Sequence, residues 1–284
     1  RSTQAKTLFP YTTLFRSYGP STHKNRAICP GWQNDADSDK AHADEGTLLH
    51  KATETGVLDG LNEEQKDCVT SCLRYVGRLE QDAVEVHKEV RLSILGGLTF
   101  GTSDRVIVRR AAGKLHLDVV DFKFGRNSVD EASVNLQGWN YVLGAFDLYP
   151  AAESATVHFV LPRRDEIDTH TFRRADYPRL ALAVKLVIER AALFSATGDE
   201  SMLNPTPQNC LYCGRKVSCS KVRTFALSVA QKYAPLEVVE EVHSSAVTNP
   251  AQMAKLYDAA KVMEKFAESV KKHALSMADR KSVV

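Results

Sequence analysis

The sequence lacks long hydrophobic runs and has almost no excess of charge of either sign. No stretch of about 18 apolar residues occurs, so we expect no membrane-spanning helix. The 37 Lys and Arg residues against 35 Asp and Glu residues leave a formal net charge of +2, which is too small to indicate nucleic-acid binding by itself. A chain of 284 residues with 43% hydrophobic and 25% charged residues is typical of a soluble globular protein with one or two domains.

Because the overall charge is balanced, a nucleic-acid-binding surface would have to be a local basic patch. The sequence has two basic clusters, namely Arg105, Arg109, Arg110 and Lys114, and Arg163, Arg164, Arg173 and Arg174. A solvated surface without a partner is the alternative for each cluster, since charged side chains are mostly exposed.

Both ends of the sequence carry segments that we expect to be foreign to the natural protein. Residues 7–17, TLFPYTTLFRS, resemble the translation of a sequencing-adapter oligonucleotide, and residues 279–284 resemble its reverse complement. We therefore assign residues 1–17 and 279–284 to adapter sequence and leave them out of the predicted domains, as for a tag or fusion scar.

The segment 101–141 carries the residues with the clearest chemistry. Runs rich in β-branched residues at 104–110 and 115–123 predict two strands joined by a short turn, and 129–149 predicts a helix after them. Pairing of the two strands as a hairpin places the start of the first beside the end of the second.

Three charged side chains meet at that end of the predicted hairpin. Alternation along the second strand puts Asp121 and Lys123 on one face, and pairing brings Asp104 near Asp121. Two converging carboxylates repel each other and must lose water, so they stabilise a fold poorly. They do provide hard oxygen ligands for Mg²⁺ or Mn²⁺, and Lys123 adds a cation that can stabilise a phosphate or position an attacking water. A D-x-K sequence in an ordinary hairpin is the alternative.

The order of motifs around these residues resembles the PD-(D/E)XK nuclease superfamily, in its RecB-, AddB- and Cas4-like branch. Residues 101–104 (GTSD) correspond to the branch's G-x-x-D motif, residues 121–125 (DFKFG) to D-Y/F-K-x-G, and residues 137–141 (QGWNY) to Q-x-x-x-Y. The resemblance implies an α/β fold with an αβββαβ core around a mixed central sheet, a cysteine-cluster loop and a helical C-terminal tail. It also implies a deoxyribonuclease (phosphodiesterase) that depends on Mg²⁺ or Mn²⁺.

The same resemblance implies a metal site made of residues far apart in the sequence. Its members would be His50, Asp104, Asp121 and the backbone carbonyl of Phe122. His50 ends the segment EGTLLH, which is similar to the G-x-x-x-H helix opening of these nucleases. Taken alone, a single histidine on a helix is more often structural or exposed. Glu89, on a predicted strand, stands where related nucleases carry an acidic residue and is a candidate accessory group.

Lys123, Gln137 and Tyr141 complete the catalytic set that the resemblance implies. Gln137 and Tyr141 are one helical turn apart, so they face the same way and would touch the substrate or orient Lys123. A polar pair buried against its neighbours is the alternative.

Four of the six cysteines form a pattern of their own. Cys210, Cys213 and Cys219 give C-x₂-C-x₅-C, and Cys29 lies far upstream as a fourth thiol. This layout resembles the iron–sulfur staple of AddB- and Cas4-type nucleases, which implies a structural [4Fe–4S] cluster bound by these residues. Four thiolates also suit Zn²⁺, and disulfides are a third alternative, disfavoured in a cytosolic enzyme.

The full order of motifs is similar to a phage-encoded exonuclease-like family, the DUF2800 group, over about residues 26–278. The resemblance predicts a nuclease domain with its cysteine staple at 18–222 and a helical extension at 223–278. It implies a DNA exonuclease of phage or prophage recombination and DNA processing, in the cytoplasm of a bacterial host. Its partners would be DNA and a single-strand annealing or recombinase protein, with no membrane. A catalytically inactive DNA-binding module of the same fold and a zinc-stabilised interaction protein are the alternatives.

Overall fold

The computed structural model describes residues 18–35, 40–216, 218–222, 224 and 249–281. These residues fall into two compact units, and each is described by itself. The first contains residues 18–24 and 40–192, and the second contains residues 25–35 and the described residues from 193 onward. Within the described residues, every helix is too short or too polar to cross a membrane.

Parts of the sequence-based predictions fall outside the described residues. They are the adapter segment 1–17, most of the first part of the helical extension (223 and 225–248) and residues 282–284.

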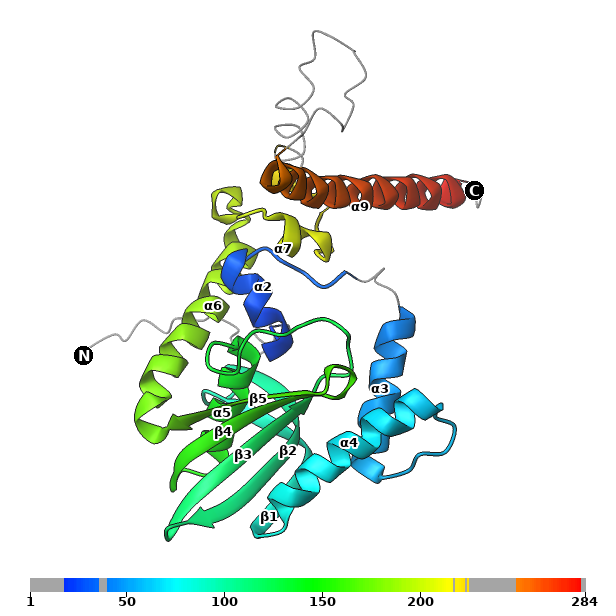
Figure 1. The fold of residues 1–284 in the computed structure, drawn as a ribbon. Coiled ribbons are helices and arrows are strands. Elements are labelled where there is room, and N and C mark those ends of the chain that lie inside the picture. The colour runs from blue at the N-terminus through cyan, green and yellow to red at the C-terminus, as the bar shows by residue number, and fades with distance from the viewer. Residues whose placement is uncertain (1–17, 36–39, 217, 223, 225–248, 282–284) are drawn as a thin grey trace, which may run out of the picture. The chain divides into compact units, whose positions relative to one another are not determined.

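The first unit is built on a five-stranded mixed sheet in the order β1-β2-β3-β4-β5 (Figure 1). The strands are β1 (Ala83–Ile94), β2 (Thr99–Ala111), β3 (Lys114–Phe122), β4 (Ala152–Leu161) and β5 (Glu166–Arg173). β3 and β4 are parallel, and all other neighbours are antiparallel. The turn between β2 and β3 has Ala112 and Gly113 at φ 51° and 79°, which is the backbone of a two-residue hairpin turn.

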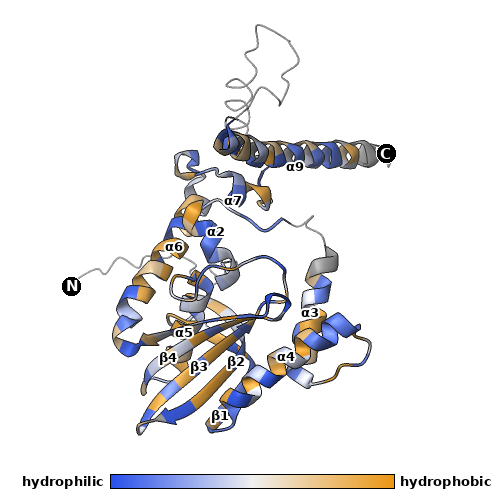
Figure 2. Cartoon of the chain, in the orientation of Figure 1, coloured by the Kyte–Doolittle hydropathy of each residue, from blue (hydrophilic) through white to orange (hydrophobic). Residues whose placement is uncertain are grey.

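Helices pack against both faces of this sheet (Figure 1). On one face lie α5 (Leu136–Leu148) and the first part of α6 (Tyr177–Thr197), and on the other lie α3 (Lys40–Thr55) and α4 (Glu63–Glu80). Side chains alternate between the two faces along each strand, so that Val119 packs on the α5 side and Val120 on the α3–α4 side. Figure 2 shows apolar residues concentrated on the central strands, as expected when both faces are covered.

The predicted α/β fold with its mixed sheet is confirmed, and two details differ. The helix predicted at 129–149 begins only at Leu136, because the Asn135 side chain accepts hydrogen bonds from the backbone N–H groups of Gln137 and Gly138 and caps it there. β5 was not predicted. It lies at the edge of the sheet, and most of its side chains are exposed, so it lacks the hydrophobic alternation that marks a half-buried strand.

The second unit has a small core of its own. Its helices are most of α2 (His23–Ile28), the end of α6, α7 (Pro207–Leu211) and α9 (Pro250–Lys281). The indole N–H of Trp32 donates to the carbonyl of Asn209 at 3.0 Å, and Gly214 N–H donates to Gln33 O at 3.0 Å. These bonds attach the early segment to the cysteine loop.

Short 3₁₀ turns occur in both units. They are Pro20–Thr22, Pro162–Arg164 and Arg174–Asp176 in the first and Glu200–Met202 in the second.

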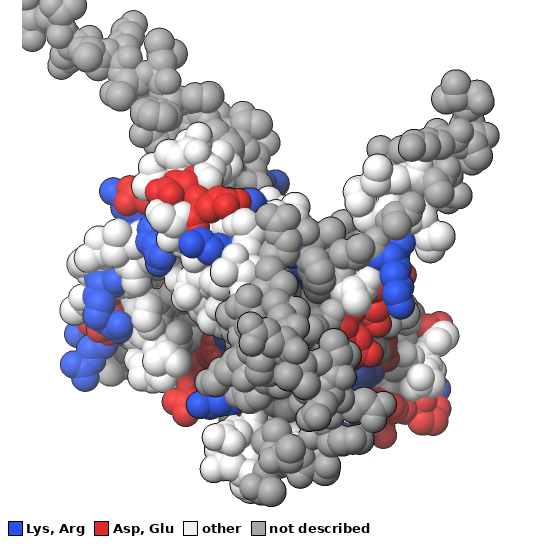
Figure 3. Space-filling model, turned by 90° about the horizontal axis from the view of Figure 1, so that it is seen from above, with Lys and Arg blue, Asp and Glu red and all other residues white. Residues whose placement is uncertain are grey.

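Charge does not mark an interface on the one face of the molecule that Figure 3 draws. On the face drawn in Figure 3, acidic and basic side chains of the described residues lie in small interspersed groups. This agrees with the balanced numbers of acidic and basic residues in the sequence.

Candidate metal centre

A cavity of about 940 Å³ in the first unit is lined by His50, Asp104, Asp121, Lys123 and other polar residues. Its walls come from α3, β1, β2, the end of β3 and α5. Elements that are far apart in the sequence therefore converge on one hollow.

The β2–β3 hairpin brings the first two carboxylates together. Arg105 pairs with Val120 in the antiparallel register, so Asp104 and Asp121 lie on neighbouring strands at the same level. Each is only 5% exposed. Asp104 Oδ2 accepts a hydrogen bond from the backbone N–H of Phe122 at 2.5 Å, and this bond joins the end of β3 to β2. Phe122 also lines the cavity.

His50 reaches this pair from α3. Its Nδ1 lies 2.7 Å from Asp104 Oδ1, and its ring meets the edge of Phe124 with centroids 5.1 Å apart. Burial lowers the pKa of His50, but the hydrogen bond to Asp104 and the negative charges of Asp104, Asp121 and Glu89 outweigh burial, so the pKa is raised.

Glu89 completes an acidic cluster with His50 and Asp104. One ligand atom from each of the three residues lies within 4.8 Å of the others. Glu89 has φ 47°, an uncommon left-handed conformation for a non-glycine residue. Its Oε1 is buried and has no hydrogen-bond partner within the described part of the chain. Burial and the neighbouring charge of Asp104 raise the pKa of Glu89 to about 7.

Asp121 belongs to a second, adjoining group. Lys123 Nζ lies 2.6 Å from Asp121 Oδ2 and donates to Gln137 Oε1 at 2.8 Å. Gln137 Nε2 in turn donates to the Tyr141 hydroxyl at 2.9 Å. Burial raises the pKa of Asp121, although the ammonium of Lys123 opposes this effect. Burial likewise raises the pKa of Tyr141, so its hydroxyl stays protonated.

The structure thus brings together every residue of the predicted catalytic and metal-binding sets, in two halves. His50 and Asp104, with Glu89, form a possible metal-ligand cluster, while Asp121, Lys123, Gln137 and Tyr141 form a hydrogen-bonded chain beside it. Asp104 links the halves through its hydrogen bond to Phe122 N. A cation in the first half would stand next to the ammonium in the second.

Sequence reasoning misread one of the basic clusters near this site. Arg105 is 1% exposed and Arg109 makes two hydrogen bonds to Asp118 at 2.5 and 2.8 Å, so neither is a free surface charge. Alternation puts Arg105 on the face opposite to Asp104, but its contacts there with Thr53 of α3 and Glu80 of α4 left no signal in the strand pattern. Arg163, from the second basic cluster, does line the cavity.

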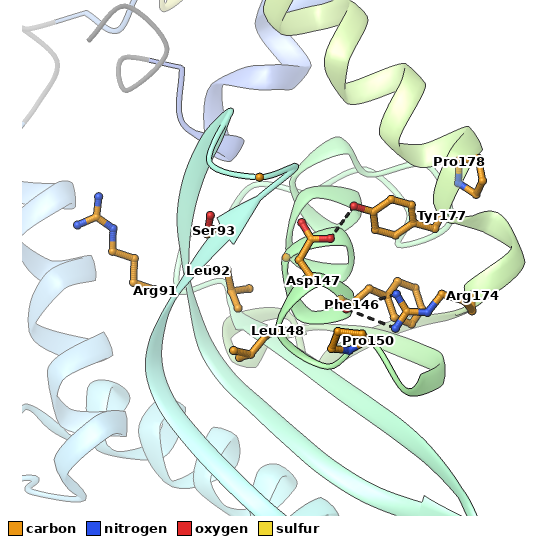
Figure 4. A pocket seen from close by; sticks show the side chains of 12 residues that line it. Arg91, Leu92, Ser93, Phe146, Asp147, Leu148, Pro150, Arg174, Tyr177 and Pro178 are labelled. Atoms are coloured by element: carbon orange, nitrogen blue, oxygen red, sulfur yellow. Dashed lines mark hydrogen bonds between the residues drawn. The ribbon is translucent and has the colours of Figure 1, made fainter. Parts of the chain in front are cut away.

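A second cavity, of about 720 Å³, lies between β1, α5 and the start of α6 (Figure 4). Two of its three charged side chains, Arg174 and Asp147, are bonded within the fold, and the third, Arg91, lies over the Phe100 ring. Arg174 lies over the Phe146 ring and donates to the carbonyl of Tyr149 at 2.7 Å, and Asp147 accepts from the Tyr177 hydroxyl and from Leu95 N–H. The cavity therefore offers a ligand fewer unbalanced groups than the acidic cluster does.

The four patterned cysteines lie in the second unit around a small cavity. Cys29, Cys210, Cys213 and Cys219 all line it, and each is a buried free thiol. Burial raises the pKa of Cys210 to about 11 and raises that of Cys213 as well. The structure therefore joins the early cysteine to the late group, as a shared metal site requires.

Comparisons with known proteins identify a family but no established activity. A family model described as "Protein of unknown function (DUF2800)" matches residues 61–283. A search of curated proteins gives no match. Among solved structures, "Crystal structure of SSO0001" is similar with 14% sequence identity and a TM-score of 0.32, covering 70% of this chain and 84% of that chain. The match to the family model spans most of the sequence, and the chain belongs to the DUF2800 family.

Proposed function

We propose that this protein is a metal-dependent deoxyribonuclease that hydrolyses phosphodiester bonds. The observation that carries the proposal is the convergence of His50, Glu89 and Asp104 beside the Asp121–Lys123 ion pair in one cavity. Carboxylate oxygens are the ligands that Mg²⁺ and Mn²⁺ prefer. An adjacent ammonium is the group that a phosphate under attack requires.

The residues of the cluster fit a divalent cation. Glu89 Oε1 is buried without a hydrogen-bond partner in the described residues, and Asp104 and Asp121 are nearly fully buried acids at neighbouring positions. His50, Glu89 and Asp104 would hold the ion. Asp121, which is paired with Lys123 Nζ at 2.6 Å, and the carbonyl of Phe122 are the further ligands that the motif order implies. When bound, the ion supplies positive charge that offsets the charge on the phosphate and makes a water more acidic.

The second half of the site would act on the substrate. Lys123 is held between Asp121 and Gln137, so its ammonium is already oriented before a substrate arrives. It would stabilise the charge that builds on the phosphate oxygens or aim the attacking water. Gln137 holds Lys123 in place and is itself oriented by its hydrogen bond to the Tyr141 hydroxyl.

DNA is the substrate that we infer for this site, and exonuclease action in phage or prophage DNA processing is the role. The order of the motifs in residues 101–141 supports both. A single-strand annealing or recombinase protein is the partner that this role implies.

A [4Fe–4S] cluster is the cofactor that we infer for the cysteine cavity. Four thiols from two distant segments converge there. The order of Cys29 and the C-x₂-C-x₅-C segment supports a cluster bound by four thiolates, and four thiolates also suit Zn²⁺.

Digestion of end-labelled single- and double-stranded DNA tests the proposed activity. The purified full chain is incubated with Mg²⁺, with Mn²⁺ or with EDTA, beside the variants Asp104→Asn and Lys114→Ala. We expect the wild type and Lys114→Ala to cut only with metal and Asp104→Asn not to cut. Folded wild-type protein that leaves both substrates intact with either metal would refute the proposal.

Iron, sulfide and zinc analysis after anaerobic purification tests the cofactor. We expect about four irons per chain with visible absorbance, and loss of both in Cys213→Ser. Stoichiometric zinc without iron would show that the cavity is a zinc site.

A further inference from the structure

We propose that Arg105 is a positioning residue that fixes the distance between His50 and Asp104. The inference rests on the proposed function, because it concerns how the ligands of that metal site are held. Arg105 itself lies outside the cavity lining.

Arg105 is tied to the backbone of both segments that carry the ligands. Its side chain is 1% exposed and lies on the face of β2 opposite to that of Asp104. Nη1 donates to the carbonyl of Asp104 at 2.7 Å, and Nη2 donates to the carbonyl of Thr53 in α3 at 2.6 Å. The planar guanidinium presents these donors at a fixed angle, so one rigid group sets where α3 lies against β2.

Thr53 connects Arg105 to His50, because it bonds both residues. It is 1% exposed, and its Oγ1 is within hydrogen-bond distance of two carbonyls of its own helix, that of His50 at 2.8 Å and that of Leu49 at 3.2 Å. His50 Nδ1 then lies 2.7 Å from Asp104 Oδ1. The contacts close a ring from Asp104 through Arg105, Thr53 and His50 back to Asp104. Loss of any of these contacts is therefore expected to move the two ligands relative to each other.

The contacts of Arg105 do not explain its presence by stability alone, because its guanidinium is incompletely paired. Glu80, its counter-charge, is 3.5 Å from Nε and 28% exposed, and Nε has no hydrogen-bond partner among the described residues. Burying a guanidinium so incompletely paired is costly, and an apolar side chain of similar size would avoid the cost. The two hydrogen bonds to ligand-bearing backbone account for the presence of an arginine here.

The variants that separate positioning from packing are Arg105→Lys and Thr53→Val. Arg105→Lys keeps the positive charge but loses the planar guanidinium that bonds two carbonyls at once. Thr53→Val keeps the shape of the side chain but loses its hydroxyl. Thr53→Ser, which keeps the hydroxyl, is the first control. Arg109→Lys is the second, because Arg109 lies on the same strand and face and binds the buried Asp118.

Calorimetric titration of the metal-free full chain with Mn²⁺ gives the dissociation constant of each variant, beside its melting temperature. We expect Arg105→Lys and Thr53→Val to weaken Mn²⁺ binding about 10-fold, as for other groups that orient metal ligands. Both controls should keep the wild-type affinity. In a His50→Ala background, Arg105→Lys should cause no further loss.

Three results would overturn the inference. They are wild-type affinity in both test variants, an equal loss in Arg109→Lys, and a full additional loss in the His50→Ala background. Should Arg105→Lys fail to fold, Thr53→Val against Thr53→Ser decides the question alone. Wild-type protein that binds no Mn²⁺ would refute the proposed function as well, whereas binding that is insensitive to these variants would refute this inference only.

Discussion

Asp118 and Asp121 lie three residues apart on β3, and both are buried. Their surroundings shift their pKa values in opposite directions. Asp118 accepts two hydrogen bonds from Arg109 at 2.5 and 2.8 Å and one from His158 at 2.9 Å. Burial alone would raise its pKa, but hydrogen bonds from His116, His158 and Arg109 outweigh burial and hold the pKa well below its ordinary value. Burial raises the pKa of Asp121 instead. Buried carboxylates are thus distinguished by their partners, not by their burial.

The surroundings of the two residues extend the comparison. Around Asp118 the polar groups satisfy one another, since His158 Nδ1 meets the Tyr75 hydroxyl at 2.8 Å and His116 Nδ1 meets Ser154 Oγ at 2.8 Å. Around Asp121 the acids converge, and Glu89 sits in a strained conformation with a buried oxygen that lacks a hydrogen-bond partner in the described chain. Strain and unbalanced charge persist where function uses them.

The largest expected effect on stability is at Asp118. Replacing it with Asn leaves Arg109 and the histidines without their counter-charge, and we expect the free energy of unfolding to fall by about 3–5 kcal/mol, as for other broken buried pairs. Asp121→Asn in EDTA-treated protein should cost less, because relief of the repulsion with Asp104 offsets the loss of the ion pair with Lys123. Urea unfolding of both variants measures the difference. Equal losses would remove the distinction between the two regions.

Among the residues that would act on the substrate rather than hold the ion, Lys123 should have the largest effect on activity. We expect Lys123→Ala to lower the rate of DNA hydrolysis by about 10²–10³, as for other electrostatic stabilisers, while DNA is still bound. Lys114→Ala is the matched control, because Lys114 lies on β3 and pairs with the exposed Glu153. Single-turnover cleavage and a binding assay measure the two quantities. An alanine variant at position 123 that cuts at the wild-type rate would remove Lys123 from the mechanism.

The two regions should also differ in the pH dependence of stability. The pKa of Glu89 is raised from 4.5 to about 7, so its contribution in metal-free protein is fully present below pH 4.5 and is lost as the pH rises through 7. The pKa of Asp118 is lowered from 3.8, so its contribution is present above that pH and is lost in more acidic solution.

Melting temperatures of EDTA-treated wild type and Glu89→Gln across this pH range test the smaller of these effects. We expect Glu89→Gln to gain stability over the wild type as the pH rises, by a few degrees, since about 1 kcal/mol moves the midpoint by about 2–4 °C in a domain of this size. Parallel curves for the two proteins would show that Glu89 does not titrate in this way.

The part of the site that a local pattern encodes was predictable from sequence. Two β-branched runs and a short turn were enough to place Asp104 beside Asp121 and Lys123, and helical spacing was enough to align Gln137 with Tyr141. The motif order added His50, which lies 54 residues before Asp104. The predicted α/β class followed from the same motif order, whose implied order of elements the predicted strands and helices match.

The remaining features depend on packing that one sequence does not display. The motif order made Glu89 a candidate accessory group, but its positive φ of 47° inside β1 was not predicted, because the pattern indicates an ordinary strand. The partner of Arg105 is a backbone carbonyl of Thr53, and backbone acceptors leave no trace in side-chain patterns. β5 was missed because an exposed edge strand has no apolar face to reveal it.

The central claim is that the acidic cluster of His50, Glu89 and Asp104 is a binding site for a divalent cation. The melting temperature of EDTA-treated protein, titrated with Mg²⁺, tests it most directly, because an ion that binds the native state stabilises it in proportion to the logarithm of its concentration above the dissociation constant. We predict that the melting temperature of the wild type rises with Mg²⁺ and that Asp104→Asn does not respond. A wild-type melting temperature that stays constant up to millimolar Mg²⁺, or an equal rise in Asp104→Asn, would contradict the account.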